Sequence, residues 1–271
     1  MARWQAQAWR LAGLVLLSAL SLQLYFAGRI ALMRWVAVES TAFQRSEIWR
    51  LASEQHRVLW SQQWVAYDRI ADPLKRAVVA SEDAGFVEHN GVEWDAIEKA
   101  WSRNQQAQAL ADKANEARAR RDAARGAKAR AVEAAPRAST QATPTQVQPK
   151  LVGGSTISQQ LAKNLFLSGE RTTARKAQEL VITLMLEALL PKQRLLACYL
   201  NNVEWGEGLF GAEAAARYYF RIPASRLSSA QAARLAVMLP APKRFEKRPD
   251  SGYVLSRAAT VQARMGAVAL P

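Results

Sequence analysis

The stretch DPLKRAVVASEDAGFVEHNG, residues 72–91, begins like a helix and ends in a cluster of acids. Asp72 followed by Pro73 is typical of an N-cap and a first helical position, and Gly85 predicts the helix end. Glu82 then emerges at the end of this helix beside apolar neighbours. Partial burial would raise its proton affinity, so that it could serve as a general base or acid near neutral pH. The alternative is an ordinary surface Glu-Asp pair.

Helical signals continue through the C-terminal half of the chain. Thr156 and Gln159 fit a capping box, which predicts a helix through ISQQLAKNLFL. Further helices are expected at 173–190, 191–202, 208–220, 228–239 and 251–265. Residues 35–70, with tryptophans and arginines at mixed spacing, are interpreted as a juxtamembrane connection. No convincing run of alternating strand residues stands out, so the predicted class is mainly α.

Length and composition allow one or two domains around a substantial core. The chain has 271 residues, half of them hydrophobic, a formal net charge of +14 and a pI near 10.4. This charge points to an anionic partner such as nucleic acid, phospholipid or a phosphorylated substrate. Cys198 is the single cysteine and His56 and His89 are the two histidines, which excludes an internal disulfide and leaves too few ligands for structural zinc.

The N-terminal region contains a candidate membrane anchor. Residues 11–28 carry no charge over 18 positions, and Trp9 and Trp35 could anchor the two interfaces. We therefore expect residues 1–35 to form one membrane anchor. The alternative is a cleaved signal peptide, which would usually have a shorter apolar region and a small-residue cleavage site. Arginines on both sides leave the orientation ambiguous by charge alone.

Residues 103–150 differ in composition from the rest of the chain. They are rich in alanine, glutamine and arginine, with ten basic and four acidic residues and three prolines near the end. The alanine-rich half could be helical, but it lacks a sustained stripe of large apolar residues. We expect a solvated basic insertion of low complexity. The segment lacks the interleaved aromatic residues of a nucleic-acid-binding arm, so no nucleic-acid partner is expected.

Several catalytic motifs are excluded by their context. GEGLFG has the spacing of a dinucleotide-binding loop, but a helix precedes it and no acid stands about twenty residues on, so we interpret it as a turn. No phosphate-binding G-x-x-x-x-G-K-[ST] loop is present in the sequence. Neither G-x-S-x-G nor S-x-x-K occurs, which argues against nucleophilic serine catalysis.

Two helices downstream carry groups that could bind a diphosphate. Thr156, Gln160 and Lys163 or Asn164 share one helical face. On the next helix, Arg175 and Glu179 lie one turn apart. Together they could offer amide, ammonium and guanidinium donors to an anion. The alternative for Arg175 and Glu179 is a solvent-exposed ion pair that contributes a few tenths of a kcal/mol.

Taken in order, these blocks resemble the peptidoglycan glycosyltransferases of family 51. The pattern E-D-x-x-F-x-x-H-x-G spans 82–91, GSTISQQLAKN runs from Gly154 to Asn164, and R-K-x-x-E spans 175–179. Y-L-N-x-x-x-x-G follows at 199–206, and GAEAAARYYF and LPAP continue the pattern. The resemblance covers roughly residues 70–245. The single anchor and the missing S-x-x-K block resemble a monofunctional, membrane-anchored member.

The resemblance implies a helical, lysozyme-like glycosyltransferase domain over residues 36–271. Its implied substrate is lipid II, a disaccharide-pentapeptide on a polyprenyl diphosphate, which is polymerised into a growing glycan strand. Glu82 matches the general base that deprotonates the 4-hydroxyl of the acceptor sugar. The oxygen then attacks the anomeric carbon of the growing chain with inversion, forms a β-1,4 bond and releases polyprenyl diphosphate. Cations near the leaving group would stabilise its charge.

The resemblance also carries over residue by residue. Glu179 matches a second essential glutamate, which either orients the cations or holds a divalent ion such as Mg²⁺ or Mn²⁺ against the diphosphate. Lys163 and Arg175 match donor-site cations. The further substrate-binding candidates are Asp83, Phe86, His89, Thr156, Gln160, Asn164 and Lys176. Of these, Asp83, Phe86 and His89 are expected to shape the loop around Glu82. The long insertion departs from the family pattern in a region beside the acceptor site.

The implied location is the cytoplasmic (inner) membrane, with one span and the catalytic domain on the outer, periplasmic face. The membrane, lipid II and other cell-wall synthesis and division proteins would be the partners. A lysozyme-like lytic enzyme, with Glu82 as general acid, is the alternative enzyme. It would have no need for the cations Lys163, Arg175 and Lys176. A membrane-tethered scaffold that binds an anionic polymer through the insertion is the non-enzymatic alternative.

Overall fold

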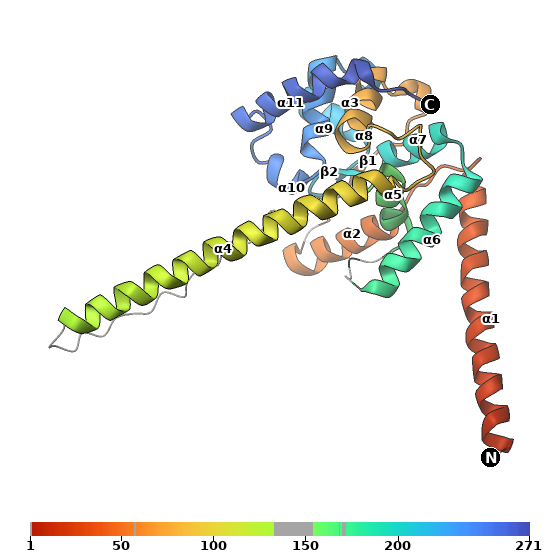
Figure 1. The fold of residues 1–271 in the computed structure, drawn as a ribbon. Helices are drawn as coiled ribbons and strands as arrows, with labels where there is room; N and C mark the ends of the chain where they lie inside the picture. The colour runs from red at the N-terminus through yellow and green to blue at the C-terminus, as the bar shows by residue number, and fades with distance from the viewer. Residues whose placement is uncertain (1, 57, 133–153, 168, 170–171) are drawn as a thin grey trace. The chain divides into compact units, whose positions relative to one another are not determined.

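The computed structural model describes residues 2–56, 58–132, 154–167, 169 and 172–271. The chain divides into two compact units, one of residues 1–92 and 155–271 and the other of residues 93–154. The predicted mainly α class is confirmed (Figure 1). The first unit contains every candidate site residue named above.

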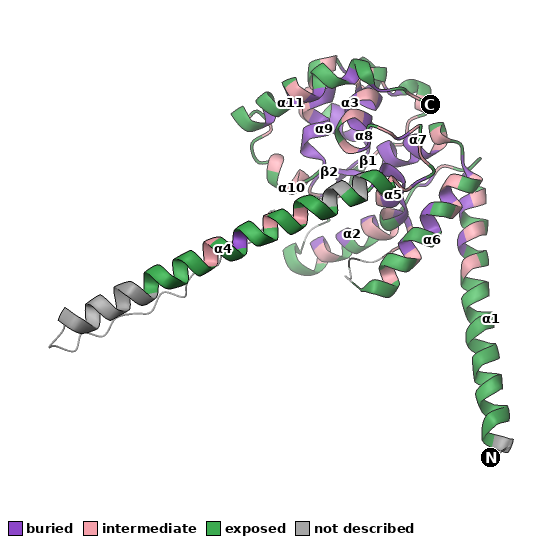
Figure 2. Cartoon of the chain, in the orientation of Figure 1, coloured by how far each residue is buried: buried purple, intermediate pink, exposed green. Residues whose placement is uncertain are grey.

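The second unit contains one long helix, α4 (Trp94–Val132). Most of its described side chains are exposed (Figure 2). Alanine and arginine dominate its sequence, so it is helical without a wide apolar face to bury. The alanine-rich part of the predicted insertion is thus helical as far as Val132, whereas residues 133–150 of that prediction lie outside the described residues.

Helix α1 (Ala2–Leu32) is long and apolar enough to cross a membrane, and Trp4–Leu32 is the candidate span. Its side chains are exposed over most of its length, and its C-terminal part packs against α6 (Thr173–Leu189) (Figure 2). Phe26 and Ile30 are buried in the main core. The side-chain amides of Gln23 in α1 and Gln178 in α6 exchange hydrogen bonds of 2.9 and 3.0 Å.

The core of the first unit is a helical assembly in which α9 (Ser229–Met238) packs against α3 (Asp72–Glu82) and α11 (Gly252–Arg264). Alanines of α9 are buried, and their small side chains allow close approach on both sides. The remaining helices of this unit are α2 (Ala42–Gln55), α5 (Ile157–Phe166), α7 (Lys192–Asn202), α8 (Ala212–Phe220) and the short α10 (Pro242–Phe245). Single 3-10 turns cover Tyr67–Arg69, Ala224–Arg226 and Met265–Ala267.

Helix starts agree with the sequence in part. The capping box of Thr156 and Gln159 is confirmed at the start of α5. The prediction that Asp72 is the N-cap of α3 is wrong, because Ala71 takes that position and Asp72 is already helical. The Asp72 carboxylate instead pairs with Lys75 Nζ at 2.7 Å, one turn along the same helix.

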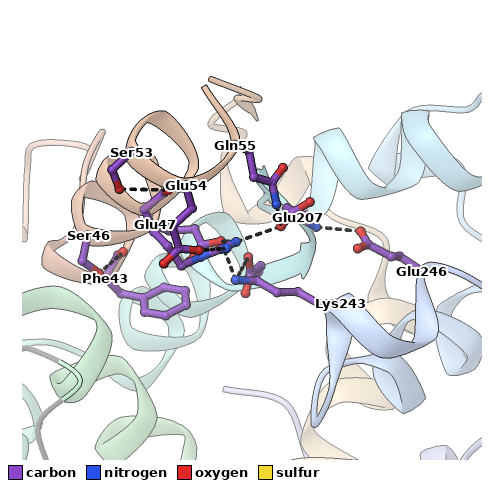
Figure 3. Close-up of polar contacts among 11 residues, drawn as sticks. Phe43, Ser46, Glu47, Ser53, Glu54, Gln55, Glu207, Lys243 and Glu246 are labelled. Carbon is purple, nitrogen blue, oxygen red and sulfur yellow. Dashed lines mark hydrogen bonds and ion pairs between the residues drawn. The ribbon is translucent and has the colours of Figure 1, made fainter. Parts of the chain in front are cut away.

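The interpretation of residues 35–70 as a connection is also wrong in part, because α2 lies within them. Thr41 and Gln44 form a full capping box at its start. Figure 3 shows how α2 is fixed to the core. Glu47 pairs with Lys243 of α10, and Arg50 pairs with Glu207 at 2.8 Å.

A small sheet completes the first unit. Strand β3 (Leu209–Phe210) lies between β1 (Ser61–Gln62), to which it is parallel, and β2 (Glu204–Gly206), to which it is antiparallel. The turn predicted at GEGLFG is the β2–β3 hairpin. Gly208 has φ +70°, and a Cβ there would collide with the backbone of Leu59, so the turn requires glycine.

Candidate active site

Glu82 is the last residue of α3, and the loop after it is tied to the start of α5. The Asp83 carboxylate accepts a hydrogen bond from the backbone N–H of Ile157 at 2.9 Å and contacts His89 Nε2 at 2.8 Å. Thr156 Oγ1 donates to the carbonyl of Gly91 at 2.7 Å. These contacts hold the carboxylate of Glu82 beside α5.

Gly91 is a tight point of this loop. Its φ is +88°, and an added Cβ would lie 2.8 Å from both Thr183 Cγ2 and Glu187 Cγ in α6. Phe86 is fully buried in the core, and the ammonium of Lys192 lies 4.6 Å from the centre of its ring. The loop is therefore packed on both sides.

The Glu82 carboxylate is joined to α5 by one amide. Gln160 Nε2 donates to Glu82 Oε2 at 2.9 Å, and Tyr199 Oη of α7 donates to Gln160 Oε1 at 2.9 Å. Burial raises the pKa of Glu82, the Gln160 hydrogen bond opposes this, and the charge of Asp83 adds to the rise. A base with a raised pKa takes up a proton more readily near neutral pH.

A cationic pocket of about 380 Å³ opens between α5, α6 and α2. Four predicted charged residues meet there, namely Lys163, Arg175, Lys176 and Glu179. Gln160 and Asn164, also predicted, line the same pocket. The other lining residues are Phe43, Ser155, Gln159, Leu167 and Gly169.

Glu179 is the centre of the charge arrangement. Its side chain is 4% exposed, Arg175 Nη1 lies 2.9 Å from its Oε2, and Lys176 pairs with its Oε1. The pair with Arg175 is therefore not the solvent-exposed ion pair that the sequence left open. Burial lowers the pKa of Lys163, and the attraction of Glu179 opposes that shift.

One guanidinium donor of Arg175 has no partner within the described chain. Arg175 Nε is buried and forms no hydrogen bond there. This atom has almost no accessible surface, so a ligand in the pocket does not reach it in this conformation. Leaving it unpaired costs free energy, as for any buried donor without a partner.

Four of the predicted substrate-binding residues do not line this pocket: Asp83, Phe86, His89 and Thr156. The Thr156 hydroxyl already caps α5 and donates to Gly91, so the structure gives it a place in the loop. Phe43 was not predicted, because it belongs to α2. Its sequence signal is the capping box of Thr41 and Gln44, which encloses it.

Comparison with known proteins decides the family. A model described as Transglycosylase matches residues 51–113 and 130–266. The chain belongs to this transglycosylase family. All the residues that line the cationic pocket lie within the matched ranges except Phe43. Residues 114–129 of α4 lie outside the matched ranges.

Curated relatives match along the whole chain. A biosynthetic peptidoglycan transglycosylase of Burkholderia thailandensis is 46% identical over 100% of this chain and 89% of its own length. Its counterpart in Paraburkholderia phytofirmans is 44% identical over 99% of this chain and 94% of its own length. The counterpart in Bordetella pertussis is 46% identical over 92% of this chain and 89% of its own length. The transglycosylase relationship therefore extends to the N-terminal helix and to α4.

Proposed function

We propose that this protein is a peptidoglycan glycosyltransferase that polymerises lipid II into β-1,4-linked glycan strands with release of polyprenyl diphosphate. One observation carries the proposal. Gln160 touches the Glu82 carboxylate and also lines the pocket that holds Lys163, Arg175 and Glu179. A base and a cationic site thus lie one side chain apart. The names of the curated relatives supply the substrate class.

The proposed reaction is a displacement at the anomeric carbon of the growing strand. Glu82 removes the proton from the 4-hydroxyl of the acceptor sugar, and that oxygen forms the new bond from the opposite face. The bond from the anomeric carbon to the diphosphate breaks, and its electron pair leaves with the diphosphate. Inversion follows because attack and departure are on opposite faces. Glu82 is suited to this step because burial raises its pKa.

The cations would stabilise the departing diphosphate. Lys163 and Arg175 are the principal candidates because both line the pocket, and the Arg175 side chain is only 18% exposed, which strengthens its electrostatic interactions. Lys176 is more exposed and is proposed to act as an additional charge.

Glu179 is proposed to orient these cations. Both of its oxygens are engaged by Arg175 and Lys176, and it belongs to no cluster of three metal-ligating side chains among the described residues. A divalent ion prefers several oxygen ligands and no adjacent ammonium or guanidinium groups. The residues at Glu179 therefore do not fit a Mg²⁺ or Mn²⁺ site, and no step is assigned to a metal.

We propose that residues 1–35 anchor the protein in the cytoplasmic membrane and that residues 36–271 form the catalytic domain on its outer face. The apolar helix α1 supports the anchor. Its contact with α6 supports a pocket close to the membrane surface, where a substrate with a lipid tail is held. Residues 103–150 would be an insertion in this domain.

Purified full-length protein and lipid II test the proposal. Wild type should produce long glycan strands, and Glu82→Gln should abolish polymerisation while the substrate still binds. Glu88→Gln is a matched control, because Glu88 is an exposed residue of the same loop. Polymerisation by Glu82→Gln would refute the assignment of the base. Cleavage of isolated sacculi, without use of lipid II, would instead favour the lytic alternative.

A further inference from the structure

Tyr199 is a buried titratable residue that the proposed reaction does not use. It lies on α7, and it is 1% exposed. Its hydroxyl has one described hydrogen bond, the 2.9 Å donation to Gln160 Oε1. Burial raises the pKa of the phenol well above its ordinary value, so the hydroxyl keeps its proton at neutral pH and remains a donor.

The hydroxyl helps to determine which end of the Gln160 amide meets Glu82, together with the Ser155 carbonyl, which accepts a longer hydrogen bond of 3.5 Å from Gln160 Nε2. An amide has one accepting oxygen and one donating nitrogen, and an ionised carboxylate can only accept. Because Tyr199 donates to Oε1, Nε2 is directed to Glu82 Oε2. Three helices contribute one member each to this chain of two hydrogen bonds, α7, α5 and α3.

We propose that Tyr199 is a positioning residue for the base, which keeps the Glu82 carboxylate ionised by holding the Gln160 amide with its nitrogen towards it. This inference rests on the proposed function, since it assumes that Glu82 accepts a proton. Tyr199 touches neither substrate nor reacting atoms in this proposal and acts through Gln160.

The expected direction of the effect follows from the groups that face Glu82. Asp83 on its own helix end and burial both favour the protonated acid, whereas the Gln160 amide favours the carboxylate. The phenol of Tyr199, on α7, is neutral and contacts Gln160. Within the described ranges, no ion pair joins Glu82 to a lysine or an arginine. Without the phenol, the amide can rotate and present its oxygen, which favours the protonated acid further.

The test is the pH dependence of kcat/KM for lipid II in Tyr199→Phe. Its acidic limb should move up by about one pH unit, which corresponds to about a tenfold higher proton affinity of Glu82. KM at high pH should stay near the wild-type value, because the phenol contacts no substrate. Incorporation of 3,5-difluorotyrosine at position 199, a stronger donor that preserves the shape of the side chain, should move the limb in the opposite direction.

A double-variant cycle isolates the route through Gln160. Gln160→Met removes the amide, so adding Tyr199→Phe to it should produce no further shift of the acidic limb. Tyr219→Phe is the matched control, since it also deletes a phenol donor, here of a half-buried tyrosine that bonds the Trp205 carbonyl at 2.8 Å. It should leave the limb in place. Additive shifts, or an unchanged limb in both Tyr199 variants, would overturn the inference.

A second readout separates this inference from the proposed function. Carbodiimide reacts with protonated carboxyls, so the pH dependence of labelling at Glu82, measured by peptide mass spectrometry, reports the pKa without turnover. The labelling midpoint should rise in Tyr199→Phe even if lipid II proves not to be the substrate. An unchanged midpoint in folded Tyr199→Phe would reject the positioning role, whatever the activity of the wild type.

Discussion

The Asp83 carboxylate accepts a 2.9 Å hydrogen bond from the backbone N–H of Ile157, the first residue of α5. The residue after the proposed base thus binds the N-terminus of the helix that carries Gln160 and Lys163. The position is electrostatically favourable, because the first N–H groups of a helix lack partners within it and attract anions. Through this bond the two halves of the site are held at a fixed separation.

Asp83→Asn should lower both stability and polymerisation. The neutral amide cannot accept from Ile157 and from His89 at once with the same strength, so one buried partner is left unsatisfied. We expect a loss of about 1–3 kcal/mol in the free energy of unfolding. Urea unfolding and lipid II turnover measure the two effects. Asp250→Asn, at an exposed ion pair with Arg234, is the control and should change neither by much.

Arg175 should matter more than Lys176 for the leaving group. The Arg175 side chain is 18% exposed, whereas that of Lys176 is 57% exposed. The conservative change Arg175→Lys should lower kcat/KM by about 10- to 100-fold, because an ammonium lacks the planar fork of donors. Lys176→Gln should cost less than about fivefold. Steady-state kinetics with lipid II would decide, and equal losses would contradict the ranking.

Stability should fall as the pH rises through neutrality because of Glu204. This carboxyl is 7% exposed, and burial raises its pKa to about 7, while Lys243 opposes the rise and Glu47 and Glu246 add to it. Its Oε1 lies 3.6 Å from Lys243 Nζ and has no hydrogen bond within the described chain. A raised folded pKa favours the folded state below the ordinary glutamate pKa, and this contribution is lost as the pH passes about 7.

Glu204→Gln should remove that dependence. Between pH 5 and pH 8 the free energy of unfolding should fall more in wild type than in the variant. The two decreases should differ by up to about 3 kcal/mol. Chemical unfolding across this pH range measures the difference. Glu39→Gln, at an exposed position, should keep the wild-type profile. Parallel profiles for wild type and Glu204→Gln would show that Glu204 does not hold a raised pKa.

Gly91→Ala should loosen the loop behind Glu82. The added methyl group would face Thr183 and Glu187 at 2.8 Å, in a backbone conformation with φ +88° that L residues rarely adopt. Strain and overpacking together predict a loss of about 2–4 kcal/mol. Gly252→Ala is the matched control, because nothing lies within 4 Å of its added Cβ and it starts α11. Thermal unfolding should separate the two variants clearly.

Local signals in the sequence were sufficient for most helices of the core. The helix expected at 173–190 is α6, Thr173–Leu189 in the structure, and the helix expected at 228–239 is α9, Ser229–Met238. Each of these helices has a Ser or Thr cap and an apolar periodicity, which act within a few residues of each other. Strands of two or three residues are too short for alternation to be visible, so the sheet could not be predicted.

Helix α2 was missed because its buried face is polar. Gln44 and Glu47 are buried beside Leu51, so the segment has no apolar stripe, and the periodicity that marks an amphipathic helix is absent. The buried polar groups are satisfied by distant partners. Gln44 donates to the carbonyl of Asn202, and Glu47 pairs with Lys243. The capping box at Thr41 was the one local signal for this helix.

In the candidate site, too, local spacing predicted some of the contacts, and contacts between distant residues were missed. Helical spacing grouped Gln160 with Lys163 and Asn164 correctly, since all three line the pocket. It also grouped Thr156 with them, but Thr156 is the N-cap, and its extended backbone directs the hydroxyl to the helix end. The bond between Tyr199 and Gln160 joins residues 39 apart in sequence, which no local pattern reveals.

The amide pair of Gln23 and Gln178 has a further consequence for the proposed membrane anchor. Gln178 immediately precedes Glu179, and Gln23 lies within the candidate span. A polar side chain in an apolar span gains from such a partner and resists sliding past it. Under the proposed anchoring, the pair would hold this part of α6 at the depth of Gln23 in the span. A substrate whose tail stays dissolved in the bilayer could then reach the cations without being lifted out of it.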